Sequence, residues 1–329
     1  MTSNSQLLPC CFYPTTIVLV DDDEKLLESW EALFAEHDFL CVSFSKPQEA
    51  LEFINNQKTA TLKELCLRDA EQVPNDYEPH NSNQYQMSID TSCITNLRKS
   101  PDRHKTVTVV ITDYAMPNMN GIEFCRQINN PLIYKAILTG AADERLALEA
   151  FNHGIIHQFM MKNNPEIKQT LFDQAMLGQR QYFMRQSELI YTAYDDSLLS
   201  RPYLSSPSFI QWFFNWIQEN HIIEYYLNTD SHGLDFLLMD HHKNESILSI
   251  RSEADINDGL LVAAQDHNAD GALDNIINDL QAKKSMPVFM TTKQVQASPS
   301  TWKPLMHTMS KVPADLPQTL YYSHNKVSA

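Results

Sequence analysis

A short segment near the beginning of the chain reads Ile17-Val18-Leu19-Val20-Asp21-Asp22-Asp23. An uninterrupted apolar run of this length is typical of a strand that is buried on both faces of a parallel sheet. After the three acids, apolar residues recur at spacings of three and four from Leu26 to Phe34, which predicts an amphipathic helix. The segment therefore predicts a strand, an acidic turn and a helix, which together form the first unit of an α/β fold.

The same alternation of strand and helix continues as far as residue 162. Further strands are expected at Phe39–Phe44, Val107–Thr112, Ala136–Leu138 and Phe159–Met161. Helical patterns lie between them, and five short strands interleaved with helices predict a five-stranded, doubly wound parallel sheet. In such sheets the chemistry takes place beyond the carboxyl ends of the strands. The polar residues expected at those ends are Asp21, Asp22, Asp113, Thr139 and Lys162.

These polar residues form a set that suits phosphoryl chemistry. Three carboxylates held together repel one another, and a divalent cation such as Mg²⁺, which prefers oxygen ligands, removes that conflict. A carboxylate beside such an ion can attack a phosphoryl group and form an aspartyl phosphate. The hydroxyl of Thr139 and the ammonium of Lys162 would then help to neutralise the phosphoryl oxygens.

Four motifs in the right order carry a resemblance to a known family. They are Val18–Asp23, Ile111–Gly121, Ile137–Gly140 and Phe159–Lys162. Together they resemble the receiver domain of two-component response regulators, which implies a flavodoxin-like fold. The resemblance covers about residues 15 to 180.

The resemblance implies a role for each of the strand-end residues. Asp113 is expected to accept a phosphoryl group from a histidine kinase, and Thr139 and Lys162 are expected to read the phosphorylated state. The Mg²⁺ ligands would be Asp21, Asp22, Asp113 and the backbone carbonyl of Ala115. Phe159 resembles the aromatic residue that moves inward when the threonine moves; the alternative is a plain core aromatic.

Two departures from the receiver pattern concern the course of the chain. Residues 56–105 are rich in Asn, Gln, Ser, Thr and Asp, and they are expected to form a polar insertion. Asn163 and Asn164 separate Lys162 from Pro165, whereas the family usually has proline directly after the lysine. Asp23 is expected to be a helix N-cap rather than a metal ligand.

The second half of the chain is expected to form a separate domain. Residues 165–194 predict one long helix, whose apolar stripes would fit either a coiled-coil stub or packing against the two domains. An aromatic helix at 209–220 precedes three strands, expected at 222–227, 234–239 and 246–250, that form an antiparallel meander. The predicted organisation is an extension at 1–14, a receiver domain at 15–164, a linking helix at 165–197 and an α+β output domain at 198–329.

Composition limits the classes of partner and the compartment. The net charge of −16 disfavours a general electrostatic attraction to nucleic acid or to an anionic membrane. Six cysteines without a CxxC pair favour free thiols in a reducing cytoplasm. Neither a transmembrane segment nor a signal peptide is evident, so a cytoplasmic location without membrane association is expected.

The combined interpretation is a phosphorylation-activated response regulator that is not an enzyme. An enlarged receiver, a long helix and an output half without recognised motifs resemble the quorum-sensing response regulators of Legionella. Phosphorylation is expected to switch homodimerisation or the contacts of the output domain, whose partner we expect to be a protein. The alternatives are a transcription factor or RNA-binding regulator, and a phosphorylation-gated enzyme that uses Asp240, His241 and His242.

Overall fold

The computed structural model describes residues 7–57, 60–69, 87–140, 144–193, 201–228, 233–265, 271–289, 294 and 296–326. Contacts divide the chain into two compact units, and each unit is assembled from segments that are not continuous in sequence. We call Tyr13–Thr61 with Lys99–Gln186 the parallel-sheet unit. Met1–Phe12, Leu62–Arg98 and Ser187–Ala329 form the antiparallel-sheet unit.

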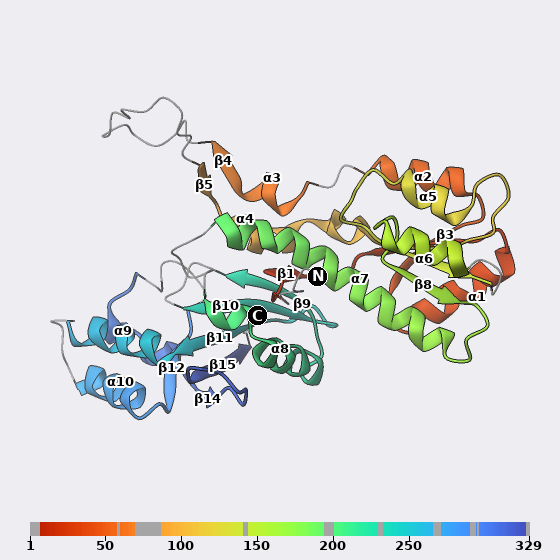
Figure 1. The fold of residues 1–329 in the computed structure, drawn as a ribbon. Coiled ribbons are helices and arrows are strands. Elements are labelled where there is room, and N and C mark those ends of the chain that lie inside the picture. The colour runs from red at the N-terminus through yellow and green to blue at the C-terminus, as the bar shows by residue number, and fades with distance from the viewer. Residues whose placement is uncertain are drawn as a thin grey trace. The chain divides into compact units, whose positions relative to one another are not determined.

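The parallel-sheet unit has five strands in the order β3-β2-β6-β7-β8, and all four strand pairs are parallel. The predicted doubly wound sheet is therefore confirmed. Helices alternate with the strands along the chain, as the colours of Figure 1 show. The elements are β2 (Thr16–Val20), α1 (Glu24–Ala35), β3 (Leu40–Phe44), α2 (Pro47–Asn55), β6 (Val107–Asp113), α5 (Gly121–Arg126), β7 (Tyr134–Thr139), α6 (Glu144–Asn152), β8 (Gln158–Met161) and α7 (Ile167–Ala193), which belongs to this unit as far as Gln186.

Both faces of this sheet are covered, which explains why its central strands are continuous apolar runs. All seven residues of β6 are buried, and successive side chains point to opposite faces. Val110 packs with α2, α5 and α6 on one face, whereas Val109 and Ile111 pack with α1 and α7 on the other. The two layers of helices leave the carboxyl ends of the strands available for polar side chains.

The polar insertion contains regular structure of its own. Its described elements are α3 (Leu62–Cys66), β4 (Leu67–Asp69), β5 (Met87–Ile89), α4 (Ser92–Asn96) and two 3₁₀ turns at Leu97–Lys99 and Pro101–Lys105. β4 and β5 pair antiparallel. Residues Leu62–Arg98 belong to the antiparallel-sheet unit, although the sequence places them between two strands of the parallel sheet.

A disulfide joins α3 to α4 through Cys66 and Cys93, whose Cα atoms are 5.7 Å apart. The prediction that the cysteines are all free thiols is therefore wrong for this pair. Two short helices within the insertion, α3 and α4, bring the two sulfurs together, a contact that the sequence pattern could not indicate. The other four cysteines are free, namely Cys10, Cys11, Cys41 and Cys125.

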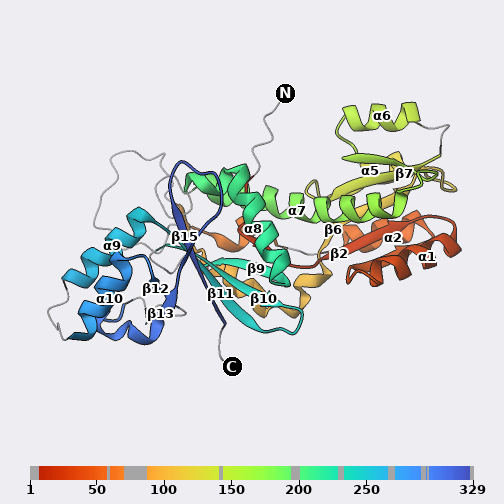
Figure 2. The same cartoon turned by 90° about the horizontal axis from the view of Figure 1, so that it is seen from below.

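The antiparallel-sheet unit contains a six-stranded sheet in the order β1-β9-β10-β11-β15-β14. The predicted meander is confirmed, because β9 pairs antiparallel with β10 and β10 pairs antiparallel with β11. Figure 2 shows these strands together with the two-stranded sheet of β12 and β13 beside α9 and α10. The elements are β1 (Cys11–Phe12), a 3₁₀ turn (Pro202–Ser205), α8 (Pro207–Glu219), β9 (Ile222–Asn228), β10 (Leu234–Asp240), β11 (Glu245–Ser252), α9 (Glu253–Ala264), α10 (Gly271–Gln281), β12 (Ser285–Pro287), two 3₁₀ turns (Pro299–Thr301 and Lys303–Leu305), β13 (Met306–Thr308), β14 (Ser310–Lys311) and β15 (Leu320–Lys326).

The two faces of this sheet bury different helices. On one face, Phe213 of α8 packs edge-on against Tyr225 and at a tilt against Phe236, with ring centroids 5.1 and 4.7 Å apart. On the other face, Tyr321 packs against the apolar cluster of α9 and α10. This mixture of an antiparallel sheet and helices confirms the predicted α+β class. Within the described part of the chain, no helix has the length and apolar character needed to cross a membrane.

Candidate functional site

The carboxyl ends of four neighbouring strands bring the predicted polar residues to one edge of the parallel sheet. Asp113 is the last residue of β6, and Asp21 and Asp22 follow directly after β2. Thr139 ends β7 and Lys162 follows β8. The parallel pairing of these strands is the reason that residues far apart in sequence meet here.

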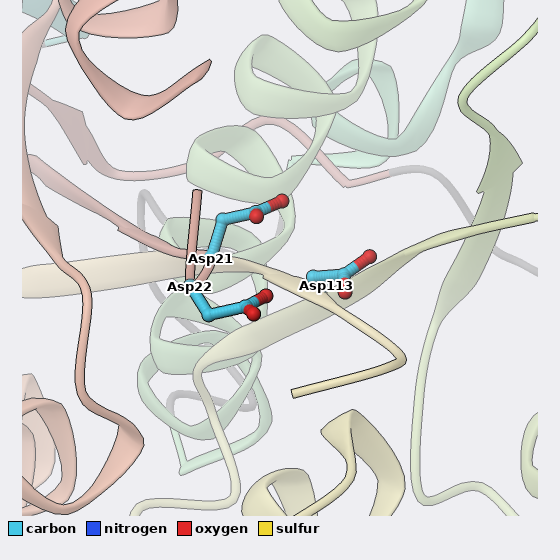
Figure 3. A group of neighbouring side chains, drawn as sticks. All are labelled: Asp21, Asp22 and Asp113. Carbon is cyan, nitrogen blue, oxygen red and sulfur yellow. The ribbon is translucent and has the colours of Figure 1, made fainter. Parts of the chain in front are cut away.

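Three carboxylates gather at this edge. Oxygen atoms of Asp21, Asp22 and Asp113 all lie within 4.8 Å of one another, and Figure 3 shows the three side chains side by side. Asp21 and Asp113 are buried, whereas Asp22 is exposed. A hard divalent cation such as Mg²⁺ suits this set, because it takes carboxylate oxygens and retains several waters. An exposed ligand on one side leaves room for those waters.

Lys162 supplies positive charge to the same group. Its Nζ atom donates to Oδ2 of Asp21 at 2.8 Å and lies 2.7 Å from Oδ1 of Asp113. Burial lowers the pKa of Lys162, but the hydrogen bonds that its ammonium donates to Asp113 and Asp21 outweigh burial and leave the pKa raised. The lysine is therefore held as a cation between two carboxylates.

The protonation of Asp21 responds to competing effects. Burial raises the pKa of this carboxyl, and the nearby charge of Asp113 raises it further. The hydrogen bonds from Lys162 and from the backbone N–H of Asp23 lower the pKa, but the net shift is upward. The site therefore resists full ionisation, which is the conflict that a bound cation would relieve.

Asp23 takes no part in this cluster of carboxylates. Its side chain accepts hydrogen bonds from the backbone N–H groups of Lys25 and Leu26 at the start of α1. The prediction that Asp23 is a helix N-cap is confirmed. The motif of three acids thus divides into two candidate ligands and one capping residue.

Backbone groups fix the orientation of Asp113. The backbone N–H of Ala115 donates to Oδ2 of Asp113 at 2.9 Å. Gly121 lies so close that a Cβ atom there would be 2.3 Å from the backbone oxygen of Asp113. A glycine is therefore required where α5 begins, and the sequence motif contains it without revealing this contact.

Thr139 lies on β7, which pairs with β6, and Phe159 lies on β8, which pairs with β7 at the edge of the sheet. Thr139 is fully buried, and its hydroxyl donates to the backbone oxygen of Gly140 at 3.0 Å. Phe159 is half-buried and packs against the core cluster on the face of α5 and α6. The switch role of these two residues stays a prediction.

The residues of the enzyme alternative lie in a turn. Asp240 ends β10, and its Oδ1 accepts hydrogen bonds from the backbone N–H groups of His242 and Asn244. The hydrogen bond from the side chain of Asn244 and these backbone hydrogen bonds lower the pKa of Asp240. Asp240 therefore organises the β10–β11 turn, and this observation does not favour an active site.

Comparisons with known proteins bear on the whole architecture. No protein-family model matches the chain, and no curated protein matches it. Among solved structures, the Legionella pneumophila response regulator LqsR is 26% identical, with a TM-score of 0.77. That match covers 98% of this chain and 91% of the other, so the similarity extends over both units.

Two further solved structures match only about half of the chain. An uncharacterised protein from Neptuniibacter caesariensis is 22% identical over 54% of this chain and 96% of its own, with a TM-score of 0.37. A response regulator receiver domain protein from Clostridium thermocellum is 16% identical over 54% of this chain and 98% of its own, with a TM-score of 0.30. The match over nearly the whole length of both chains supports the identification of this chain as a response regulator with a receiver domain.

Proposed function

We propose that this response regulator is switched by phosphorylation of Asp113. The observation that carries the proposal is the arrangement around this carboxylate. Asp113 is buried at the end of a central strand, with two further carboxylates and the ammonium of Lys162 within reach. A nucleophile, candidate metal ligands and a cation are the parts that phosphoryl transfer to an aspartate needs.

In the proposed reaction, a carboxylate oxygen of Asp113 attacks the phosphorus atom of a phosphohistidine on a histidine kinase. The new P–O bond forms as the P–N bond breaks, and the histidine leaves with the electron pair of that bond. Lys162 would neutralise the oxygens of the transferred group, since its Nζ already lies 2.7 Å from Asp113. Mg²⁺ held by Asp21, Asp22, Asp113 and the carbonyl of Ala115 would supply further positive charge when bound.

The consequence of phosphorylation follows from the packing of the neighbouring strands. We propose that Thr139 moves toward the new phosphoryl group and that Phe159 moves with it. Phe159 is only half-buried, so it has room to change its packing against the core. The change would promote a homodimer or alter the contacts of the output domain, whose partner we propose to be a protein.

The proposal also covers the domain organisation, the cellular compartment and the class of partner. The proposed organisation keeps a receiver domain at 15–164, a linking helix at 165–197 and an output domain at 198–329. We propose a cytoplasmic signalling protein without enzymatic output, and a quorum-sensing role on the basis of the sequence resemblance. Net charge favours a protein partner over nucleic acid, because acids outnumber bases by 41 to 25.

The experiment that tests the proposal is phosphorylation by acetyl phosphate with Mg²⁺, followed by intact-mass measurement. The wild-type chain should gain one phosphoryl group, and Asp113→Asn should gain none. Asp240→Asn is the matched control, because Asp240 is a half-buried aspartate at the end of β10, far along the chain from the site. Phosphorylation of Asp113→Asn to the wild-type level would contradict the proposal.

A further inference from the structure

The strand β3 is an open edge of the parallel sheet. Among the described strands it pairs only with β2, because the strand order of the sheet begins with β3. All five residues of β2 are buried, whereas Leu40 of β3 is exposed and the rest of that strand is half-buried. An open edge is a template for another strand, and proteins usually protect it with a charged residue, a proline or a bulge. The strand Leu40–Phe44 contains no charged residue and no proline, and its register with β2 has no bulge.

The backbone groups on the open side of β3 belong to Cys41 and Ser43. The backbone C=O of Phe44 accepts a hydrogen bond from the N–H of Asp21, so the backbone of Phe44 faces β2. Backbone N–H and C=O groups of successive residues in a strand point to opposite sides. The backbone of Val42 therefore also faces β2, and the N–H and C=O groups of Cys41 and Ser43 point away from the sheet.

A second β3 strand that runs antiparallel to the first would satisfy all of these outward groups in one register. If Val42 lies opposite Val42 of a second copy, Cys41 lies opposite Ser43, and each such pair exchanges both of its hydrogen bonds. A shift by one residue would place these groups opposite residues whose backbones face their own β2. A larger shift would leave some of them beyond the end of the other strand. The edge is therefore complementary to itself.

The same register brings exposed apolar side chains together. Leu40 would lie opposite Phe44 of the second copy, on the same face of the joined sheet. Leu40 is 41% exposed, and Phe44 packs against Phe53 of α2, which is 36% exposed, with ring centroids 5.2 Å apart. Pairing would therefore cover apolar surface that a single copy leaves in water.

The charges beyond the two ends of the strand favour the antiparallel direction. Asp38 and Lys46 are exposed, and each lies four residues from Val42. Antiparallel pairing brings the Asp38 end of each copy to the Lys46 end of the other, whereas parallel pairing would bring like charges together. Lys46 also pairs with Glu49, but both side chains stay more than half exposed. A local attraction of this kind opposes the general repulsion between two copies with a net charge of −16.

We propose that β3 is an interface to which a second copy of this chain adds its own β3 in the antiparallel direction. The parallel sheets of the two copies then form one continuous sheet, and the same residues contribute from both sides of a twofold axis. This inference does not rest on phosphorylation of Asp113, because the edge is already open in the structure.

Disulfide cross-linking of the full-length protein tests the register. In a Cys41→Ser background, Val42→Cys should form a covalent dimer with oxidised glutathione, because directly opposite residues of this kind have Cα atoms about 4.5 Å apart. Leu40→Cys in the same background is the matched control. Leu40 is more exposed, but its two copies would be offset along the strands by about 13 Å, too far for a disulfide. Equal cross-linking of the two variants, or none in either, would overturn the proposal.

Sedimentation velocity over a series of protein concentrations measures the dimer without a covalent link. No phosphoryl donor is present, so the result is independent of the proposed chemistry at Asp113. Leu40→Lys places a charge at the pairing edge and should raise the Kd of the dimer at least about tenfold. Leu177→Lys, on α7, is the matched control because Leu177 is also 41% exposed, and it should leave the Kd unchanged. A wild type that is monomeric at every concentration, or equal weakening by both variants, would contradict the proposal.

Discussion

The Nζ atom of Lys162 lies 2.7 Å from Oδ1 of Asp113 and 2.8 Å from Oδ2 of Asp21. One lysine thus joins two nearly buried carboxylates that extend from neighbouring parallel strands. The ammonium is the counter-charge of the site when no cation is bound. This relationship makes the stability of the parallel-sheet unit depend on the same groups that we propose to carry out the chemistry.

Replacing the lysine should therefore weaken the fold. Lys162→Met leaves Asp21 and Asp113 facing each other without compensation, and we expect a loss of about 1–3 kcal/mol in the free energy of unfolding at neutral pH. The lower part of this range is expected, because the lysine side chain is 32% exposed. Urea unfolding in EDTA measures the effect. Added Mg²⁺ should restore more stability to the variant than to the wild type. If Lys162→Met is as stable as the wild type in EDTA, the lysine is not the counter-charge of the two carboxylates.

The three consecutive acids should differ in their contributions to Mg²⁺ binding. Asp22→Asn removes the charge of a candidate ligand, and we expect the affinity to fall at least about tenfold. Asp23→Asn is the matched control, since asparagine is as good an N-cap as aspartate. Calorimetric titration with Mg²⁺ provides the measurement. Equal loss of affinity in both variants would show that the loss comes from removing a nearby negative charge and not from removing a metal ligand.

The pH dependence of stability should have a contribution from His157. Burial, followed by the charges of Arg185 and Lys135, lowers the pKa of His157 to about 4. Its Nδ1 accepts a hydrogen bond from the backbone N–H of Lys135 at 3.0 Å, which a proton on that nitrogen would break. Between about pH 6.5 and 4 the unfolded chain binds a proton that the folded chain does not, so stability falls as the pH is lowered through this window.

Unfolding by urea at several pH values checks this expectation. His157→Gln should flatten the dependence in that window, whereas His153→Gln, at an exposed position, should leave the slope unchanged. A slope that is the same in the wild type and in His157→Gln would contradict the assignment.

The disulfide between Cys66 and Cys93 should stabilise the antiparallel-sheet unit. It closes a loop with a sequence separation of 27, for which chain entropy predicts a contribution of about 3.5 kcal/mol. Reduction should therefore lower the stability of the wild type and have no effect on Cys93→Ser. Cys41→Ser, which removes a free thiol, should behave as the wild type does. Identical behaviour of Cys93→Ser and the wild type toward reductant would show that the bond does not form.

The sequence predicted the parallel sheet and its edge because the pattern there is local. Each strand is an apolar run that ends in a polar residue, so Asp21, Asp113, Thr139 and Lys162 could be placed at strand ends without any contact information. The same holds for the meander of β9, β10 and β11, where turn residues separate alternating strands. The cap formed by Asp23 was predictable for the same local reason.

Other features depend on contacts between distant segments and could not be predicted in this way. The insertion reads as polar, yet Cys66 and Cys93 are brought together by two short helices, and Leu62–Arg98 groups with the second unit. Similarly, β1 pairs with β9 across more than 200 residues of sequence, at Cys11 with Tyr226 and Phe12 with Tyr225.

The central claim is that Asp113 is the residue that receives the phosphoryl group. The most direct measurement is borohydride reduction of the phosphorylated protein, which converts an aspartyl phosphate to homoserine, followed by peptide mapping by mass spectrometry. The account predicts homoserine at position 113 in the wild type, dependent on Mg²⁺, and no conversion at Asp21 or Asp22. Conversion at another aspartate, or none in protein treated with acetyl phosphate and Mg²⁺, would contradict it.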